Sequence, residues 1–468
     1  MKIYNTLNRQ KDPLTPLTPG KIKMYTCGQT VYNDIHMGNA RFYVVYDAVR
    51  RYLEYRGYSV EYIQNFTDID DKTIQRANEE GITTEQIAEK YIASTIADLA
   101  ALNVKPAISN PRVTEEIPEI IEMVGQLIIS GNAYENNGTV YYDVNSFPSY
   151  GKLSKKNIDD LEAGARVEVE ANKKNPMDFV LWKPAKPGEP SWGSPWGNGR
   201  PGWHIECSAM IRKYLGDEID IHGGGADLIF PHHENEIAQS EAVTGKNLAR
   251  YWMHCGMITV DHKKMSKSRG NFATLKDVAE KYPYDVIRFF FLSGHYRMPM
   301  EFTDASLTAA QQGLNRIKNC YNNILHALKM SEDTLPGDYN STDAQIYIDN
   351  FMQAMDDDFN TADAITAIFE LVKHINTHMG KDETYSNEFL LYSRDKLTLL
   401  TSILGIDLDQ PSDSGDDSFN NKIEALIAAR QAARKNKDFA EADRIRNQLT
   451  DLGIILEDTR EGVRWHRA

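Results

Sequence analysis

The segment Met24–Arg41, which reads MYTCGQTVYNDIHMGNAR, holds the residues best suited to chemistry. A short apolar stretch with period-two character ends at Thr26–Gly28, which is typical of a buried strand that opens onto a turn. His36 and Asn39 follow about one turn apart, at the start of an expected helix. Exposed backbone N–H groups and the helix dipole favour phosphate at such a position. Gly38 leaves room there for a flat ring to approach the backbone.

A second segment, Lys264–Ser268, reads KMSKS and carries two candidate cationic groups, Lys264 and Lys267. Each short motif alone has an ordinary interpretation as loop or surface turn. Together they resemble the two signatures of class I aminoacyl-tRNA synthetases, of which the first is usually written HIGH. Asn39 stands at its last position here. An amide keeps a hydrogen-bond donor of similar reach but cannot carry a proton charge, so we expect His36 to contribute more.

A possible metal site comes from residues that lie far apart in the sequence. His232 and Glu236 are four residues apart on a predicted helix, so their side chains share one face. With Cys27 and Cys207 they form a set of two thiolates, an imidazole and a carboxylate, all suitable for zinc. The alternative is a surface His–Glu pair and two buried cysteines. Spacing alone leaves both interpretations open.

Composition limits the class of protein. A chain of 468 residues predicts three or four domains. The hydrophobic content of 41% and charged content of 25% are typical of a soluble globular protein. We find no bilayer-length apolar run and no leader at Met1, so we expect a cytoplasmic protein. Four scattered cysteines predict reduced thiols or metal ligands, and a net charge of −15 argues against a general nucleic-acid coat protein.

The order of expected elements predicts an α/β fold with a Rossmann-like parallel sheet, formed by residues 1–109 and 202–245. The helix expected over residues 40–57 is followed by a second strand at 58–63. An acidic loop, Asn65–Lys72, then lies at the carboxyl edge of the sheet, where such folds bind ligands. Its alternative interpretation is a helix start capped by Thr67 or Asp68.

The remaining segments differ in character. Residues 110–201 predict a connective insertion with a helix at 117–130, a strand at 139–144 and then loop-rich sequence, whose tryptophans form either a stacking surface or a small irregular core. A helix is expected to begin within residues 356–360. The further predicted units are a stem-contact segment with the lysine loop (246–306), a helical bundle (307–406), an acidic linker (407–420) and a tail of two helices and a β-like end (421–468).

From end to end the chain resembles the cysteinyl-tRNA synthetase family. The motifs that carry the resemblance are TCGQTVYNDIHMGN, NFTDIDDK, NPMDFVLWK, GRPGWHIECSAM, DIHGGGADLIFPHHENEIAQS, YWMH, KMSKS and MDDDFNT. The resemblance implies formation of cysteinyl-adenylate from L-cysteine and ATP, with Mg²⁺ accompanying ATP, followed by transfer to the 3′ end of tRNA(Cys). It also implies one zinc ion that binds the substrate thiolate, with Cys27, Cys207, His232 and Glu236 as ligands.

A zinc ion would have a physical task in this family. A methylene-sized difference between substrates is worth only about 1–3 kcal/mol in a pocket, which makes cysteine hard to distinguish from serine. Zinc prefers a thiolate to a hydroxyl, so the resemblance implies no editing domain. It places ATP at His36, Gly38 and Asn39, with Gly224 and Asp227 against the nucleoside. Lys264 and Lys267 would stabilise the charge that develops on the phosphoryl oxygens.

The resemblance also implies contacts to the amino acid and to tRNA. The residues near the amino acid would be Gly28, Thr30, Thr67 and Trp203. Those that read or stack anticodon bases would be Arg434, Phe439, Asp443 and Asp458; without the resemblance they form an ordinary charged surface. Gln75 replaces a lysine that the family links to persulfide synthesis, which leaves that side activity open. We expect a monomer.

Two rival functions remain at this stage. One is a related ligase that joins cysteine to an amino-sugar, against which the tail after Asn421 argues. The other is a catalytically idle tRNA-binding scaffold, which has no need of a complete metal and ATP set.

Overall fold

The computed structural model describes residues 1–156, 173–260, 263–264, 273–330, 342–380, 386–409, 417–459 and 462–467. Its centre is a parallel sheet with the strand order β10-β9-β3-β4, which confirms the predicted α/β fold. The strands are β3 (Lys21–Thr26), β4 (Ser59–Gln64), β9 (Ile219–Gly225) and β10 (Ala249–Cys255). An antiparallel hairpin, β1 (Lys2–Asn5) and β2 (Gln10–Pro13), precedes the sheet.

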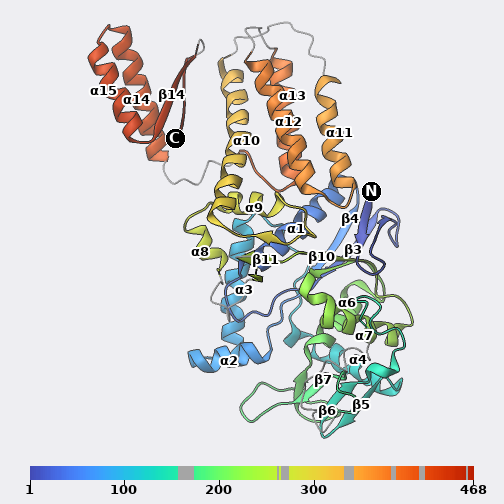
Figure 1. Ribbon diagram of the computed structural model, residues 1–468. Helices are drawn as coiled ribbons and strands as arrows, with labels where there is room; N and C mark the ends of the chain where they lie inside the picture. Colours follow the sequence, from blue (N-terminus) through green and yellow to red (C-terminus); the bar gives the residue numbers. More distant parts are fainter. Residues whose placement is uncertain are drawn as a thin grey trace.

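Helices cover both faces of this sheet (Figure 1). The helix α1 (Met37–Tyr55) lies on the face toward the helical bundle, whereas α6 (Trp203–Leu215) and α7 (Glu234–Thr244) lie on the other face. Alternation along β3 follows this division: Met24 packs in the cluster that contains α1, and Tyr25 packs in the cluster that contains α6 and α7. Cys27 follows the parity of Tyr25 and therefore emerges on the side of α6 and α7.

The start of α1 differs from the prediction in one respect. The helix begins at Met37 rather than at residue 40, because His36 is extended and caps it. The His36 Nδ1 accepts hydrogen bonds from the backbone N–H groups of Gly38 at 3.0 Å and Asn39 at 3.2 Å. Two of the N–H groups that we expected to be exposed for phosphate are therefore bonded to the imidazole ring.

The acidic loop after β4 leads into α2 (Asp71–Glu80) and α3 (Thr84–Ala101). The predicted caps at Thr67 and Asp68 are wrong, because Asp70 caps α2 through a hydrogen bond from the Lys72 N–H. Thr67 instead extends the sheet edge: its backbone N–H donates to Gln29 and its carbonyl accepts from Val31.

The insertion forms a sheet of its own beyond α4 (Ile117–Ile129), which matches the predicted helix. The antiparallel order is β5-β6-β7-β8, and the strands are β5 (Ala133–Asn136), β6 (Thr139–Tyr142), β7 (Phe179–Pro184) and β8 (Gly199–Pro201). The loop-rich interpretation is thus wrong for β7, which pairs with β6, and for β8, which pairs with β7. Trp182 is fully buried and lies 6.1 Å from the Trp196 ring, so these two tryptophans pack a core.

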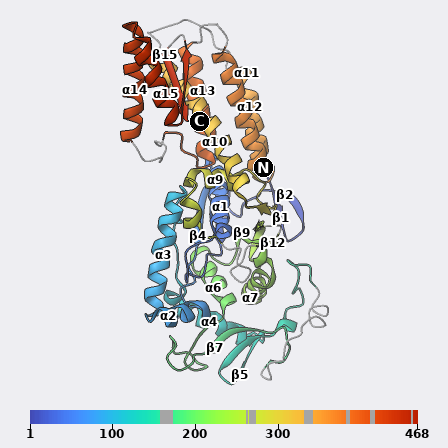
Figure 2. The ribbon, with the colours of Figure 1, turned by 60° about the vertical axis from the view of Figure 1, so that its left-hand side comes forward.

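The carboxyl-terminal half is mainly helical. It contains α8 (Leu275–Ala279), α9 (Tyr284–Leu292), α10 (Asp304–Met330), α11 (Thr342–Asp356), α12 (Thr361–Met379) and α13 (Asn387–Ile403). A small sheet combines β11 (Ile258–Val260) and β12 (Lys263–Lys264), which precede α8, with β13 (Met300–Glu301), which lies between α9 and α10. The tail comprises α14 (Asp417–Lys435), α15 (Phe439–Asp451) and a hairpin of β14 (Ile454–Thr459) and β15 (Gly462–Arg467). The tail and the insertion sheet lie at opposite ends of the molecule (Figures 1 and 2).

The helix expected to begin within residues 356–360 begins one residue later, at Thr361 of α12, because a turn between α11 and α12 precedes it. Asp358 and Phe359 have φ angles of 71° and 51°, a left-handed conformation in which helix cannot continue. The Asp358 carboxylate compensates for this turn: it accepts hydrogen bonds from the Tyr4 N–H, the Tyr296 hydroxyl and Arg297. Asn360 then caps α12.

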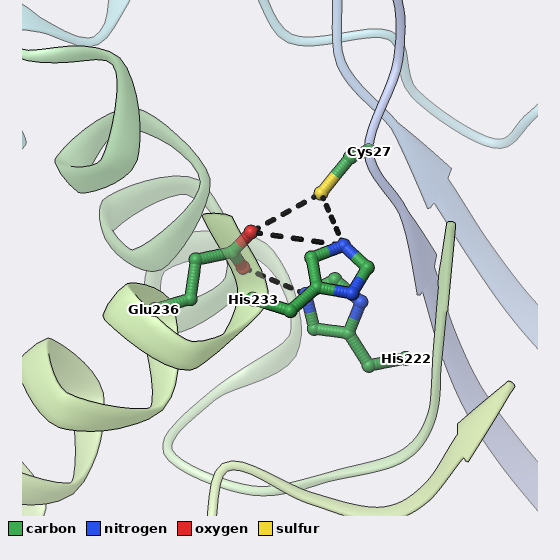
Figure 3. A group of neighbouring side chains, drawn as sticks. All are labelled: Cys27, His222, His233 and Glu236. Carbon is green, nitrogen blue, oxygen red and sulfur yellow. Dashed lines mark hydrogen bonds and ion pairs between the residues drawn. The ribbon is translucent and has the colours of Figure 1, made fainter. Parts of the chain in front are cut away.

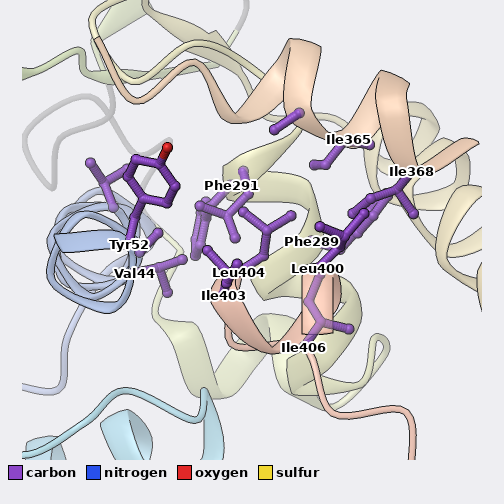
Figure 4. Packing of buried hydrophobic residues seen from close by; sticks show 14 of the residues in the cluster. Val44, Tyr52, Phe289, Phe291, Ile365, Ile368, Leu400, Ile403, Leu404 and Ile406 are labelled. Atoms are coloured by element: carbon purple, nitrogen blue, oxygen red, sulfur yellow. The ribbon is translucent and has the colours of Figure 1, made fainter. Parts of the chain in front are cut away.

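The largest apolar cluster joins the sheet-containing half to the helical bundle. Figure 4 shows Val44 and Tyr52 of α1 close to Phe291 of α9 and to Ile403 and Leu404 of α13. A buried ion pair lies in the same region. Arg288 donates to Asp47 and to the carbonyls of Leu102 and Leu404, so one guanidinium ties α9 to α1, to the end of α3 and to the end of α13.

Two further findings concern the whole described chain. All four cysteines are buried free thiols, as predicted. Among the described helices, none combines the length and the apolar character that a membrane crossing requires.

We expect Arg288→Met to lower the free energy of unfolding by about 3–5 kcal/mol, because it leaves the Asp47 carboxylate buried without its main partner. Burial opposes ionisation of Asp47, but Arg288 and Arg51 outweigh burial and lower its pKa. Urea unfolding followed by circular dichroism measures the change. Lys246→Met, which removes an exposed pair with Asp217, should cost less than about 1 kcal/mol. Equal losses in the two variants would contradict the prediction.

Candidate active site

The four residues predicted as metal ligands come together in the structure. The Sγ atoms of Cys27 and Cys207, a nitrogen of His232 and a carboxylate oxygen of Glu236 all lie within 4.8 Å of one another. Each of the four residues is at most 5% exposed. The alternative interpretation, a surface pair and two unrelated buried cysteines, is therefore wrong.

Separate elements position these side chains. Cys27 follows β3, and Cys207 lies on α6. His232 is the last but one residue of a short helical segment, Ile229–His233, that leads directly into α7 with Glu236. The insertion anchors the start of α7, because the buried carboxylate of Glu234 accepts hydrogen bonds from the backbone N–H groups of Gly151 at 2.9 Å and Ser154 at 2.7 Å. The insertion thus supports the cluster without contributing a ligand atom.

The neighbours of Glu236 shift the pKa values of the groups in the cluster. Burial opposes ionisation of Glu236, but His222 and His232 outweigh burial and hold its pKa well below the usual range. Burial also disfavours a charged His232, yet Glu236 raises the pKa of this imidazole to about 10. A hydrogen bond with Cys27 lowers the pKa of the Cys207 thiol to about 6, whereas burial raises the pKa of Cys27. The arrangement favours an ionised carboxylate and one thiolate.

The donor set fits a tetrahedral zinc site. The Nε2 of His232 is buried and lies 2.9 Å from Glu236 Oε1, but the geometry makes no hydrogen bond. Its Nδ1 lies 3.0 Å from the Nδ1 of His204. Burial, reinforced by His232, lowers the pKa of His204 to about 3, so His204 is neutral. One ring nitrogen of His232 is therefore held by a neighbour and the other is directed at the cluster, as in a metal-binding histidine.

A second set of donors overlaps the first and was missed by the sequence analysis. His222 and His233 meet Cys27 and Glu236 (Figure 3). The His222 Nε2 lies 2.7 Å from Glu236 Oε2, and the His233 Nε2 lies 3.4 Å from Cys27 Sγ. The available signals were the position of His222 directly before the glycine run Gly223–Gly225 and that of His233 beside His232.

The glycine run after His222 makes this arrangement possible. A Cβ atom on Gly224 would lie 2.4 Å from the His233 ring, and one on Gly223 would lie 2.3 Å from the Tyr46 ring on the opposite face. Gly224, expected against a nucleoside, therefore makes room for His233, which also contacts His254 through a 2.8 Å hydrogen bond. Gly225, the next residue along, lines the cavity described below.

A cavity of about 300 Å³ opens beside the cluster, and Cys27 lies in its wall. Most of the residues predicted to contact ATP or the amino acid line it: Gly28, Thr30, His36, Gly38, Asn39, Trp203 and Asp227. Trp203 is 41% exposed and stacks on His232 at 4.3 Å. Thr67 is not a lining residue, since its hydroxyl is buried and donates to Glu206. Lys72 and the segment Cys255–Ile258 line the cavity without having been predicted.

The lysine segment is described only in part. Lys264 lies in β12, where its backbone pairs with Thr259 of β11. Lys267 lies outside the described residues. Because β11 continues from the lining segment Cys255–Ile258, the path from the cavity to Lys264 is short along the chain.

The residues predicted to read the anticodon lie in the tail, far from the cavity (Figure 1). Arg434, in the last turn of α14, and Phe439 and Asp443 on α15 are exposed. Phe439 and Asp443 are four residues apart and share a helix face, and Phe439 is 64% exposed. Asp458 lies in β14, and its side chain is outside the described part of the chain.

Family models match most of the chain. The model described as tRNA synthetases class I (C) catalytic domain matches residues 13–312. A DALR domain matches residues 350–409, and a cysteinyl-tRNA ligase anticodon binding domain matches residues 416–465. The three matches follow the order of the sheet-containing half, the helical bundle and the tail.

Similar proteins agree with these models. A cysteine–tRNA ligase from Lachnospira eligens is 54% identical over 478 residues, and one from Clostridioides difficile is 52% identical over 471 residues; each alignment covers 100% of both chains. Methionyl-tRNA synthetase of Mycobacterium tuberculosis shares the fold, with a TM-score of 0.60 and 15% identity over 82% of this chain and 89% of that chain. The chain therefore belongs to the cysteine–tRNA ligase family of class I aminoacyl-tRNA synthetases.

Proposed function

We propose that this chain activates L-cysteine with ATP to cysteinyl-adenylate and transfers the cysteine to the 3′ end of tRNA(Cys). One observation carries the proposal: two buried thiols, an imidazole and a carboxylate meet beside a cavity that has Cys27 in its wall, and the His36–Asn39 helix start lines the same cavity. A thiol-recognising group and a class I nucleotide motif thus face one cavity.

We assign the four clustered residues, Cys27, Cys207, His232 and Glu236, to zinc. When bound, zinc supplies a soft Lewis acid that distinguishes a thiolate from a hydroxyl. The chain itself fixes the site: His204 holds the second nitrogen of His232, and His222 holds the second oxygen of Glu236. Trp203 stacks on His232 and is exposed to the cavity, so its ring closes one side of the amino-acid pocket.

The nucleotide takes the rest of the cavity in this proposal. His36, Gly38 and Asn39 lie beside the phosphates, and Asp227 lies near the ribose, with Gly224 behind it. The cysteine carboxylate attacks the α-phosphate and diphosphate leaves. Lys264 and Lys267 neutralise the charge that develops on the phosphoryl oxygens. Mg²⁺ accompanies ATP.

Gly28, Thr30 and Thr67 complete the proposed amino-acid side, with Thr67 acting from behind the cavity wall. Arg434, Phe439, Asp443 and Asp458 are proposed to bind anticodon bases, since an exposed aromatic ring beside polar groups suits unstacked bases. We also propose the domain boundaries of the sequence analysis, with catalysis in 1–109 and 202–245 and anticodon binding in 421–468. A cytoplasmic location and a monomeric state stay predictions.

The first prediction concerns the activation step. Cysteine-dependent exchange of diphosphate into ATP should be detectable, at least about tenfold faster with cysteine than with serine. Chelation should abolish it and added zinc should restore it. No exchange from a folded, zinc-loaded protein would contradict the enzyme proposal and favour a tRNA-binding scaffold. Exchange without any charging of tRNA(Cys) would favour a ligase with another cysteine acceptor.

A second prediction concerns the metal. Cys207→Ser should weaken zinc binding, because a hydroxyl replaces a thiolate in the donor set. We expect zinc content, measured by plasma mass spectrometry after dialysis, to fall from one ion per chain to less than about a tenth of that. Cys320→Ser is the matched control: this cysteine is equally buried but lies in the helical bundle. Full zinc retention in Cys207→Ser would remove Cys207 from the ligand set.

A third prediction separates the tail from the catalytic cavity. Phe439→Ala should raise the KM for tRNA(Cys) by about 5- to 100-fold, because a stacked base is worth about 1–3 kcal/mol. Diphosphate exchange, which needs no tRNA, should stay unchanged. Ile129→Ala provides the control, since Ile129 is 88% exposed in α4 of the insertion. An unchanged KM for tRNA in Phe439→Ala would refute the stacking role.

A further inference from the structure

Arg41 is an unusual buried cation. It lies in α1, two residues after Asn39, and is only 1% exposed. Within the described residues it forms no ion pair with a carboxylate, and every hydrogen bond that it donates goes to a backbone carbonyl. The Nη1 atom donates to Gly256 at 2.7 Å and to Met257 at 3.4 Å. The acceptors of Nη2 are the carbonyls of His295 at 3.2 Å, Tyr296 at 3.4 Å and Met298 at 2.8 Å.

These acceptors belong to two chain segments that are far apart in the sequence and lie side by side here. Gly256 and Met257 line the active-site cavity and lead directly into β11, which pairs with Lys264 in β12. The segment 295–298 leads into β13, which pairs with β11 on its other side. One guanidinium therefore links α1, which His36 caps, to the segment that leads into β11 and to the segment that leads into β13.

The far side of this junction is fixed independently. The Tyr296 hydroxyl donates to Asp358 at 2.7 Å, and the Arg297 Nε donates to the same carboxylate at 2.7 Å. The Gly256 N–H also donates to the Tyr296 carbonyl at 2.7 Å. Arg41 thus holds the cavity wall against a segment that the helical bundle keeps in place.

The chemistry of the side chain explains why arginine stands here. A guanidinium presents its N–H donors in a rigid planar fork, whereas an ammonium is a point charge. Only the fork spans carbonyls of two segments at once. Burial lowers the pKa of Arg41, and five carbonyl contacts offset part of the cost of burying the charge. An apolar side chain would fill the same space without the desolvation free energy that a buried charge costs, so packing alone does not explain an arginine here.

We propose that Arg41 is a positioning residue for adenylate formation, which sets the distance between the His36–Asn39 helix start and the strand that carries Lys264. This inference rests on the proposed function. It assigns to Arg41 no contact with substrate. Its effect falls on the ATP side of the cavity, because Gly256 and Met257 lie there with His36 and Asn39, while the Cys27 cluster is held by α6 and α7.

Diphosphate exchange on the full-length, zinc-loaded chain tests the inference. We expect Arg41→Lys to lower kcat/KM for ATP by about 10- to 100-fold, the loss typical of a misplaced reacting group. The KM for cysteine and the zinc content should stay within about twofold of wild type. Arg288→Lys is the matched control, because Arg288 is equally buried and also bonds backbone carbonyls, but away from the cavity. It should lower thermal stability without an ATP-specific loss.

Gly256→Ala reaches the same junction from the other side, since a Cβ atom there would lie 2.4 Å from the Met298 carbonyl oxygen. This variant should lower kcat/KM for ATP as Arg41→Lys does, without changing the KM for cysteine. It therefore tests the inference even where Arg41→Lys does not fold. The inference would be overturned if both variants impaired the use of ATP and of cysteine equally. It would also be overturned if Arg288→Lys lowered kcat/KM for ATP as much as Arg41→Lys. Either result would leave the proposed function intact. A wild-type chain without exchange would overturn both.

Discussion

The parallel sheet imposes the constraint on which the active site depends. Side chains alternate between the two faces of each strand, and the carboxyl ends of β3, β9 and β10 lie at one edge. Cys27 and His254 project from this edge toward α6 and α7, with Gly224 between them in register. The missing side chain of Gly224 admits His233. A larger residue at that position would separate the histidines from the thiols.

Around this sheet, α1 connects the chemistry to the rest of the molecule. His36 and Asn39 lie at its start and line the cavity. Arg41 donates hydrogen bonds to the carbonyls of Gly256, before β11, and Met298, before β13. Two turns later Asp47 meets Arg288 and thereby the ends of α3 and α13. Both guanidiniums are buried and both bond backbone carbonyls. The helix α1 therefore contacts the cavity at its first turn and the helical bundle further along, through two separate guanidinium groups.

In the proposed function, selection of the amino acid and selection of tRNA use separate parts of the chain. The cluster proposed to bind zinc is buried and held by hydrogen bonds from several histidines, which suits a site that must discriminate between two small side chains. The exposed residues of α14 and α15 lie at the opposite end from the insertion sheet, which suits contact with an extended nucleic acid. The insertion holds the start of α7 through hydrogen bonds to Glu234, two residues before Glu236 of the cluster.

The sequence by itself determined the α/β class and the helical nature of the second half, because period-two and helical patterns are local properties. It named Cys27, Cys207, His232 and Glu236 only as candidate ligands, since their spacing left the alternative interpretation open. It missed β7 and β8, the turn at Asp358 and the roles of His222 and His233. Strand pairing and a left-handed turn depend on distant partners such as β6, Tyr4 and Arg297. Only the tertiary structure decided that Cys27 and Cys207 meet, since residues 180 positions apart in the chain become neighbours through packing alone.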